Sequence, residues 1–538
     1  MVSDPDSRKQ FNLVVVIVLL CAVAFRAVLL LGDAFPFNAD EAIVGLMADH
    51  ILAGEWPVFF YGQAYMGSLD ATLVAGLFAL FGRAVVWIRV LQSFLYLGVI
   101  VTSMILAHRA TGSPRATLGT GLLLAFPTVN ATLYTTVSLG GYSEALLIGN
   151  LLLLLAFRWM DTDDLAWKSV ALWGFLAGVG LWAFGLTVIY VLPTAILLGW
   201  KLRHLPHGSY RLGKLAVGVL CLLLGLSPLI VWGLNHSPQL LLDEFLGAAI
   251  RDPTQDSGLR GILNHGINLL LFGPTVILGL RAPWSTQWLA PVLSIFPLAF
   301  WSLLPASLFV KLRRRSRLSG YSLLLLGVMA ADLVGFLVTP FGNDPSGRYF
   351  LPLYPLLAVA AGMVLSFAPS GRRQQQWVTV LLSGTLIFTF WTNLYSGLIA
   401  DEKLTTQFDA VSRINHRYDQ ELIKFLIQQG EYTGYSNYWV AYPIAFQSEE
   451  RLIYIPGLPY HPDLRHTQRD NRYQPYAQIV DESDRWAYIT THNPALDEWL
   501  RQALRQQGAA WEETWIGDYH IYYHVQPPLR LDALGSFD

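Results

Sequence analysis

Two neighbouring acids, Asp40 and Glu41, follow the first apolar segment of the chain in the stretch FPFNADEAIVGLMADHIL. A carboxylate that is held in place can take a proton from an attacking hydroxyl group, so an acid here could serve as a general base. Acids beside an apolar segment are also commonly solvated surface residues. The choice between these interpretations depends on the elements that carry the two acids.

The acids open a segment, residues 39–53, whose apolar residues recur at roughly helical spacing. This pattern predicts a helix that lies along the membrane surface. Asn38 or Asp40 would cap it, and both acids would stand in its first turn, where the helix dipole favours a carboxylate. A second apolar segment, residues 67–82, is too short to cross a bilayer and should lie in the outer interface.

A further acid, Glu144, follows Tyr142 in GGYSEA and enters the apolar run ALLIGNLLLLLAF. Ionisable groups at membrane depth turn towards a cavity or a partner, which favours a functional role for Glu144. An ordinary acid at a helix N-terminus would satisfy the pattern equally well.

Other polar side chains are expected at the same membrane face. Arg348 and Tyr349 lie in GRYFLPLYP, and a planar guanidinium suits a lipid-borne phosphate, although a snorkelling anchor residue explains it as well. Gln63 and Tyr65 lie between the two predicted helices of the first loop. His265 shares a helical turn with Asn268 in a later loop, where a structural role is the more common one for a histidine.

Composition places most of the chain in lipid. Of 538 residues, 54% are hydrophobic and 14% charged, with a mean hydropathy of +0.42. The net charge of −2 argues against a nucleic-acid partner. The two cysteines, Cys21 and Cys221, fall in apolar segments and are expected to be core residues rather than a disulfide or metal pair.

Hydropathy predicts a polytopic α-helical membrane protein with about eleven spans, plus interfacial helices. The first span is interpreted as a retained anchor. The spans are expected at residues 11–31, 84–107, 116–135, 145–157, 167–183, 185–200, 214–233, 290–310, 320–339, 349–367 and 376–398.

Lys and Arg fall in alternate loops, which fixes the expected orientation. With the N-terminus in the cytoplasm, 17 basic residues lie inside, among them the run KLRRRSR at 311–317. The C-terminus then lies outside, on the side of Asp40. We expect a multi-pass protein of the cytoplasmic (inner) membrane of a prokaryote.

The chain is expected to divide into a membrane domain, residues 1–399, and a small soluble α/β domain, residues 400–538, on the extracytoplasmic side. The last 138 residues hold 20 acids and 12 bases. NHRYDQELIKFLIQQG and NPALDEWLRQALRQQG predict helices. TGYSNYWVAYPIAF, ERLIYIPG, RWAYITT and YHIYYHVQP predict strands. We expect this domain to act as a lid or an acceptor-docking module.

NADEA in the first outer loop, GGYSEA in the second and GRYFLPLYP near a late helix resemble the GT-C glycosyltransferases. The nearest branch looks like the protein O-mannosyltransferases and aminoarabinose transferases, including galacturonosyltransferase-like members. The resemblance covers roughly residues 10–400. It implies a polytopic enzyme that takes a sugar from a polyprenyl-phosphate carrier, in which Asp40 matches the catalytic acid and Glu144 the second-loop carboxylate.

The chain also departs from that family. Glu follows Tyr-Ser where the second loop usually carries Asp after Arg-Pro, and GQAYMGS replaces a Lys-Pro-Pro stretch. Gln63, Tyr65 and Arg348 are therefore the candidate donor contacts, with Tyr349 beside them. Tyr142 and His265 are possible acceptor or donor contacts.

We expect inverting single displacement to an acceptor, which is a protein, a lipid or a polysaccharide, with Asp40 as base. No cofactor is firmly implied; Glu41 or Glu144 would orient the acceptor or hold a divalent cation, which prefers oxygen ligands. One alternative is a polysaccharide polymerase or ligase that uses diphosphate-linked glycans, for which Arg251, Arg260 and Arg281 are candidates. The others are a lipid or solute carrier and a sugar-binding receptor.

Overall fold

The chain divides into two compact units, each built from more than one stretch of sequence. The structure is a computed structural model that describes residues 5–162, 165–205, 208–247, 258–312, 317–366, 372–535 and 537. Arg251 and residues 313–315 lie outside the described residues. The first unit contains Met1–Ala34, Tyr65–Asp70 and Arg89–Leu404, and the second contains Phe35–Ala64, Ala71–Ile88 and Thr405–Asp538. The functional division expected at residue 400 stays a prediction.

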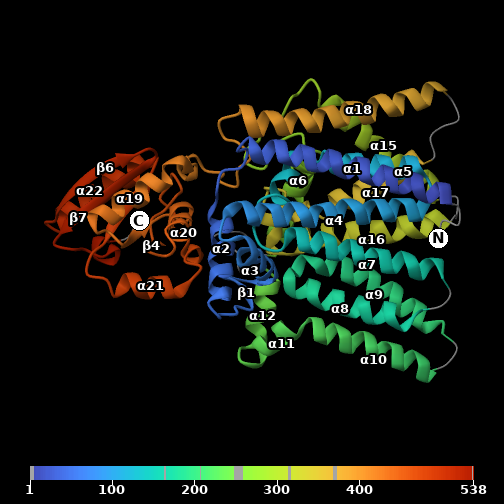
Figure 1. Cartoon of the computed structure of the whole chain (residues 1–538), viewed down its shortest axis with the longest axis horizontal. Coiled ribbons are helices and arrows are strands. Elements are labelled where there is room, and N and C mark those ends of the chain that lie inside the picture. Colours follow the sequence, from blue (N-terminus) through green and yellow to red (C-terminus); the bar gives the residue numbers. More distant parts are fainter. Residues whose placement is uncertain are drawn as a thin grey trace. The chain divides into compact units, whose positions relative to one another are not determined.

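The first unit consists of helices, most of them long and apolar, that run side by side (Figure 1). They are α1 (Pro5–Leu31), α4 (Val85–Thr111), α5 (Pro114–Ala125), α6 (Val129–Tyr134), α7 (Tyr142–Asp161), α8 (Trp167–Ala183), α9 (Val188–Arg203), α10 (Gly208–Gly225), α11 (Ser227–Leu234), α12 (Pro238–Phe245), α13 (Leu259–Ile267), α14 (Gly273–Ile277), α15 (Ile295–Leu312), α16 (Arg317–Val338), α17 (Leu353–Leu365) and α18 (Arg372–Leu394).

In the described part of the chain, eight helices are long and apolar enough to cross a membrane, which makes this a multi-pass membrane protein. The other three expected spans fall on shorter elements. Residues 116–135 form α5 and α6 on either side of Pro127, α8 has 17 residues, and α15 begins only at Ile295. The segment expected not to cross forms α3 (Leu69–Phe81), whose 13 residues extend about 20 Å, which is too short for a span.

Small residues allow a close helix contact in the first unit, between α8 and α10. A Cβ atom at Gly174 would lie 2.2 Å from the carbonyl oxygen of Gly218, and one at Gly178 would lie 2.2 Å from that of Leu222. Backbones can approach this closely only where side chains are absent, which is the usual basis of helix packing in lipid.

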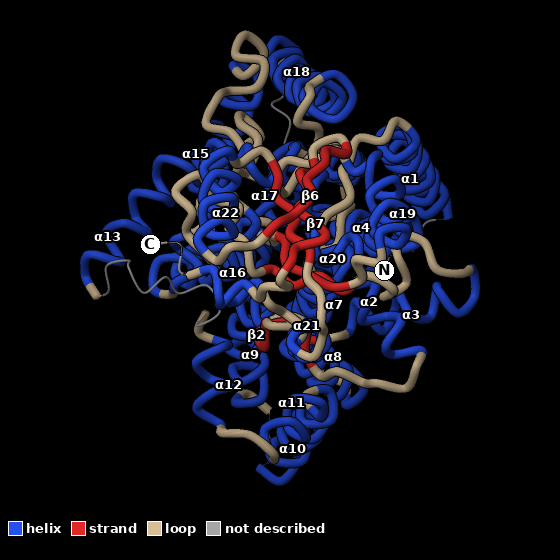
Figure 2. The backbone as a smooth tube through the Cα atoms, turned by 90° about the vertical axis from the view of Figure 1, so that its left-hand side faces the viewer, coloured by secondary structure: helices blue, strands red, loops and turns tan. Residues whose placement is uncertain are grey.

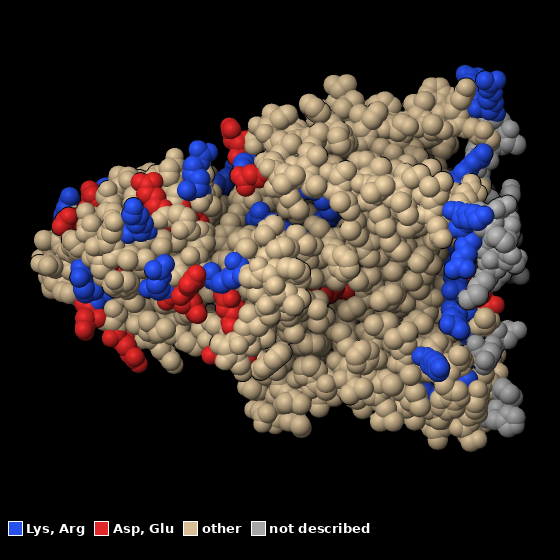
Figure 3. Space-filling model, viewed as in Figure 1, with Lys and Arg blue, Asp and Glu red and all other residues tan. Residues whose placement is uncertain are grey.

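Basic side chains gather at one end of the helices of the first unit, the end at which α1 begins (Figure 3). Lys and Arg residues stand at the start of one helix and at the end of a following one, so helices that run in opposite directions bring them to the same end of the unit. They include Arg8 and Lys9 in α1, Arg109 in α4, Arg158 in α7, Lys201 and Arg203 in α9, and Arg372 in α18.

The second unit contains a five-stranded sheet, whose strands are drawn red in Figure 2, and helices from both ends of the sequence. The sheet order is β4-β3-β5-β7-β6, with β3 parallel to β4 and β5, and β7 antiparallel to β5 and β6. Its elements are α19 (Asp419–Gln429), β3 (Thr433–Ser436), α20 (Tyr438–Gln447), β4 (Ile453–Pro456), α21 (Gln474–Asp481), β5 (Ala487–Thr491), α22 (Pro494–Gln506), β6 (Ala510–Ile516) and β7 (Tyr519–Gln526). Those from the first loop are α2 (Ala39–Leu52), β1 (Phe59–Phe60) and β2 (Gln63–Gly67), the last of which runs into the first unit.

The expected strand TGYSNYWVAYPIAF is wrong beyond Ser436. Residues 438–447 form the helix α20, which begins where the Asn437 side chain accepts a hydrogen bond from the amide of Trp439. This helix is apolar on nearly all sides and buried, and a short apolar run of this kind has no periodicity that separates a strand from a buried helix. The expected helices at α19 and α22 and the strands at β4, β5 and β7 are confirmed.

The first-loop helix α2 begins at Ala39 and is capped by Asn38, as expected. It is buried on nearly every side, so it is not a surface helix with a single apolar face. One reason is its contact with α20, where a Cβ atom at Gly45 would lie 2.4 Å from the ring of Phe446. The helix that carries the two acids is therefore held against the C-terminal part of the chain.

Candidate active site

Asp40 and Glu41 are neighbours in sequence but have different surroundings. The Asn38 side chain accepts a hydrogen bond from the Glu41 amide (2.9 Å) and donates one to the Glu41 carboxylate (3.2 Å), and Glu41 is fully buried. Glu41 therefore takes part in the helix cap. Asp40 is only half-buried, and its Oδ1 accepts a hydrogen bond from the Tyr438 hydroxyl (2.7 Å).

A cation and a second acid accompany Asp40 in the same unit. The Arg472 guanidinium lies 5.4 Å from the centre of the Tyr438 ring. With the Gln63 amide turned so that its oxygen faces this guanidinium, that oxygen accepts a hydrogen bond from Nη2 of Arg472 (3.0 Å). Burial raises the pKa of the Asp470 carboxyl to about 7; Arg472 opposes this rise and Asp40 adds to it. Gln63 thus lies beside a guanidinium that comes from the C-terminal domain.

Glu144 belongs to a buried acid pair in the first unit. The amide of Gln92 donates to Asp70 (2.9 Å) and, at 3.5 Å, to Glu144, and the Ser138 hydroxyl donates to Asp70. All four side chains are buried. Glu144 thus faces a polar partner and not lipid, as expected of an acid at membrane depth.

Arg348 is surrounded by aromatic side chains in the first unit. Its guanidinium lies 2.6 Å from the Asp344 carboxylate and 4.9 Å from the centre of the Tyr349 ring, and it interacts electrostatically with Tyr65 and Tyr142. The side chain is 28% exposed, and its terminal nitrogens make no hydrogen bond within the described part of the chain. The tertiary structure therefore brings four of the expected residues together, with donors left for an anion.

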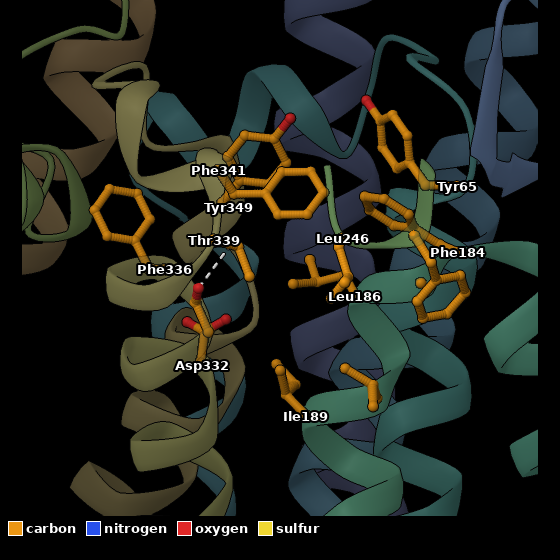
Figure 4. A pocket seen from close by; sticks show the side chains of 14 residues that line it. Tyr65, Phe184, Leu186, Ile189, Leu246, Asp332, Phe336, Thr339, Phe341 and Tyr349 are labelled. Carbon is orange, nitrogen blue, oxygen red and sulfur yellow. Dashed lines mark hydrogen bonds between the residues drawn. The ribbon is translucent and has the colours of Figure 1, made fainter. Parts of the chain in front are cut away.

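An apolar cavity of about 200 Å³ adjoins this cluster. Tyr65, Phe341 and Tyr349 line one end, and Ile189 and Asp332 lie at the other (Figure 4). Almost all of its lining is apolar, which suits a hydrocarbon chain. Asp332 is the exception, a buried acid in the middle of α16.

His265 and Arg281 contact protein groups on several sides. The ring nitrogens of His265 lie 2.9 Å from the Leu337 carbonyl oxygen and 2.9 Å from the Asn343 side chain. Arg281 donates to five oxygens, including the Pro345 carbonyl at 2.7 Å, and thereby braces the turn that precedes Arg348. These contacts are those of structural residues.

The candidate residues fall into both units. Asp40, Glu41 and Gln63 belong to the second unit. The first unit contains Tyr65, Tyr142, Glu144, His265, Arg348 and Tyr349. In the part of the chain that the structure describes, no group of three or more His, Cys, Asp or Glu could hold a metal ion.

Several residues of these clusters are absent from the sequence-based candidates, among them Asp70, Asp344, Tyr438 and Arg472. Asp70 had a usable signal, because it enters an apolar run just as Glu144 does. Asp344 stands four residues before Arg348, a spacing typical of ion pairs. No sequence pattern links Tyr438 or Arg472 to Asp40, because they lie about 400 residues from it in the chain.

Comparison with known proteins gives the fold of the whole chain. No protein-family model and no curated protein matches the sequence. The structure is similar to ArnT from Cupriavidus metallidurans bound to undecaprenyl phosphate, with a TM-score of 0.59 and 15% identity over 94% of this chain and 98% of that one. It is also similar to the Archaeoglobus fulgidus oligosaccharyltransferase in the apo form, with a TM-score of 0.55 and 11% identity over 97% and 75% of the two chains. These are GT-C glycosyltransferases, so the chain has the GT-C fold.

Proposed function

We propose that this GT-C-fold protein transfers a sugar from a polyprenyl-phosphate donor to an acceptor at the extracytoplasmic face of the membrane. The acceptor hydroxyl attacks the anomeric carbon as the bond from that carbon to the phosphate oxygen breaks. Polyprenyl phosphate leaves with the bonding electron pair, Asp40 takes the acceptor proton, and the anomeric configuration inverts. The acceptor is a protein, a lipid or a polysaccharide.

One observation carries the donor half of this proposal: a partly exposed guanidinium, Arg348, next to an apolar cavity in a membrane-spanning unit. A polyprenyl phosphate has the matching two parts, an anionic head and a hydrocarbon chain. Arg348 would hold the phosphate and stabilise the charge that grows on it as the bond breaks. The phenols of Tyr65, Tyr142 and Tyr349 would add hydrogen bonds.

Asp40 is the best-supported base among the acids. Glu41 is hydrogen-bonded to the capping residue Asn38, and Glu144 is buried beside Asp70. Asp40 is only half-buried, so an acceptor can reach it. It stands in the first turn of α2, next to the free amide groups of the helix start.

The gathering of Lys and Arg at the end of the bundle where α1 begins supports a cytoplasmic N-terminus. The membrane face at which Arg348 precedes α17 would then be extracytoplasmic, because Arg372 and Arg373 lie beyond the other end of α17. The sugar donor that the site meets at that face would be a lipid-linked polyprenyl-phosphate sugar and not a nucleotide sugar.

The test uses the full-length protein in lipid nanodiscs with a radiolabelled polyprenyl-phosphate hexose, with and without peptide, lipid A and oligosaccharide acceptors. The expected result is acceptor-dependent release of polyprenyl phosphate that Asp40→Asn slows by about 10²- to 10⁴-fold. Turnover only with diphosphate-linked oligosaccharides would identify a polymerase or ligase instead. Movement of the intact donor across the bilayer without cleavage would identify a carrier.

A further inference from the structure

We propose that the C-terminal domain completes the transfer site, because the Tyr438 hydroxyl positions the carboxylate of Asp40. This inference rests on the proposed function and deepens it. Tyr438 acts through Asp40 and is therefore a positioning residue. The domain would then be a required part of the catalytic machinery and not only a lid or a docking module.

The contact itself has the geometry that positioning requires. The Tyr438 hydroxyl donates to Oδ1 of Asp40 over 2.7 Å, while Oδ2 makes no hydrogen bond within the described part of the chain. One oxygen is thus held and the other is left to receive a proton.

Tyr438 is itself rigidly held. Its ring is 4% exposed, and it stands in the first turn of α20 immediately after the capping residue Asn437. Asn437 accepts from the Trp439 amide (3.0 Å) and donates to the Thr491 hydroxyl at the end of β5 (2.9 Å). The hydroxyl that meets Asp40 is therefore fixed to the central sheet of the C-terminal domain.

The segment 470–472 supplies the charges around this contact. The Tyr442 hydroxyl, one turn along α20, accepts from the Arg472 amide (2.6 Å) and donates to the Asp470 carbonyl (3.2 Å). A Cβ atom at Gly62 would lie 2.6 Å from Cδ of Arg472, so the first loop fits closely against this segment. The charge of Arg472 lowers the pKa of Asp470, whereas burial and the neighbouring Asp40 raise it.

A purely structural tether would give the same contact, so the test needs a readout that a tether does not change. Replacement of Tyr438 by Phe removes only the hydroxyl. In the full-length enzyme we expect Tyr438→Phe to lower kcat about ten- to a hundred-fold, as for the loss of a hydrogen bond to a charged group. KM for the polyprenyl-phosphate hexose should stay within about twofold, because the donor phosphate is bound elsewhere.

The pH dependence of kcat is the decisive readout. Loss of the hydrogen bond raises the pKa of the base, so the acid limb of the profile should move to higher pH in Tyr438→Phe. Replacement of Tyr438 by 3,5-difluorotyrosine strengthens the donor without changing the shape and should move the limb to lower pH. The control is Tyr454→Phe, which removes an equally buried hydroxyl that donates to the Glu431 carbonyl in the same domain.

Coupling between the two residues completes the test. In the Asp40→Asn background, Tyr438→Phe should cause no further loss, because the group that it positions is already neutral. The inference is overturned if both Tyr438 variants keep the wild-type pH profile, or if Tyr454→Phe matches Tyr438→Phe. A wild-type enzyme that cleaves no polyprenyl-phosphate donor overturns the proposed function, and this inference with it.

Discussion

Two adjacent acids illustrate how position decides chemistry at the scale of single residues. Glu41 is tied into the cap of α2, whereas Asp40 faces Tyr438 and remains half-buried. We expect Asp40→Asn to lower kcat by about 10²- to 10⁴-fold, the usual contribution of a general base, with donor affinity unchanged. Single-turnover assays and donor-binding titrations measure the two quantities. The control is Asp33→Asn, which removes an exposed acid paired with Lys403; full activity of Asp40→Asn would rule out its role as base.

Replacement of Arg348 should weaken binding of the sugar donor and leave the proton transfer to the base unchanged. We expect Arg348→Gln to raise KM for the polyprenyl-phosphate sugar at least tenfold, since a charge-assisted contact to phosphate is lost, and to leave the acid limb of the pH profile in place. Arg260→Gln, which removes an exposed arginine near the start of α13, is the matched control. Equal effects of the two substitutions on KM would contradict a phosphate site at Arg348.

The contact between α2 and α20 is the element-scale feature on which the site depends. We expect Gly45→Ala to destabilise the protein by about 1–3 kcal/mol, because the added Cβ would meet the Phe446 ring at 2.4 Å. Gly76→Ala in α3 has open space around it and should stabilise the protein slightly through helix propensity. Thermal unfolding in detergent compares the melting temperatures of the two variants with that of the wild-type protein. A neutral Gly45→Ala would mean that α2 and α20 can separate at little cost.

A histidine links α2 to the turn after α20 in a pH-dependent way. Burial alone would lower the pKa of His50, but the hydrogen bond and charge of Glu450 outweigh it and raise that pKa, while His50 lowers the pKa of Glu450. The stabilisation from His50 is complete below its unfolded pKa of 6.5 and is lost as the pH rises through the raised value. That from Glu450 is complete above 4.5 and is lost as the pH falls through the lowered value.

The link should therefore be strongest between about pH 4.5 and 6.5. We expect amide-exchange protection of α2 in the full-length protein to decrease as the pH rises above that window, after correction for intrinsic exchange. His50→Gln should remove this dependence. The substitution His236→Gln, at an exposed histidine of the first unit, should leave it unchanged. Persistence of the dependence in His50→Gln would assign it to another group.

At the scale of the whole molecule, the orientation of the helices decides which substrate the site can meet. With native Cys21 and Cys221 replaced by Ser, we expect a cysteine at Gln374, at the start of α18, to be labelled only from the cytoplasm. A cysteine at Gln506, at the end of α22, should react only with reagent added to the outside. Impermeant maleimides applied to spheroplasts and to inverted vesicles test this. Labelling of both positions from one side would invalidate the proposed topology.

The sequence alone determined the membrane class and the helix that carries Asp40. Hydropathy and charge alternation are properties of contiguous stretches, so they are readable without a fold, and the cap at Asn38 is a contact between residues three apart. The same local signals found α19, α22 and three strands of the C-terminal sheet. They failed at α20, whose apolar residues carry no clear period because the helix is buried on nearly all sides.

Only the tertiary structure decided which polar residues meet. It separated Asp40 from Glu41, paired Glu144 with Asp70, surrounded Arg348 with three tyrosines, and placed Tyr438 against Asp40. Apart from the adjacent pair Arg348 and Tyr349, the residues brought together here are between about 70 and 400 positions apart. The packing of complementary surfaces fixes such contacts, and it depends on shape in three dimensions and not on sequence order. The chemistry of an acid in this chain is therefore set by the side chains that folding brings to it.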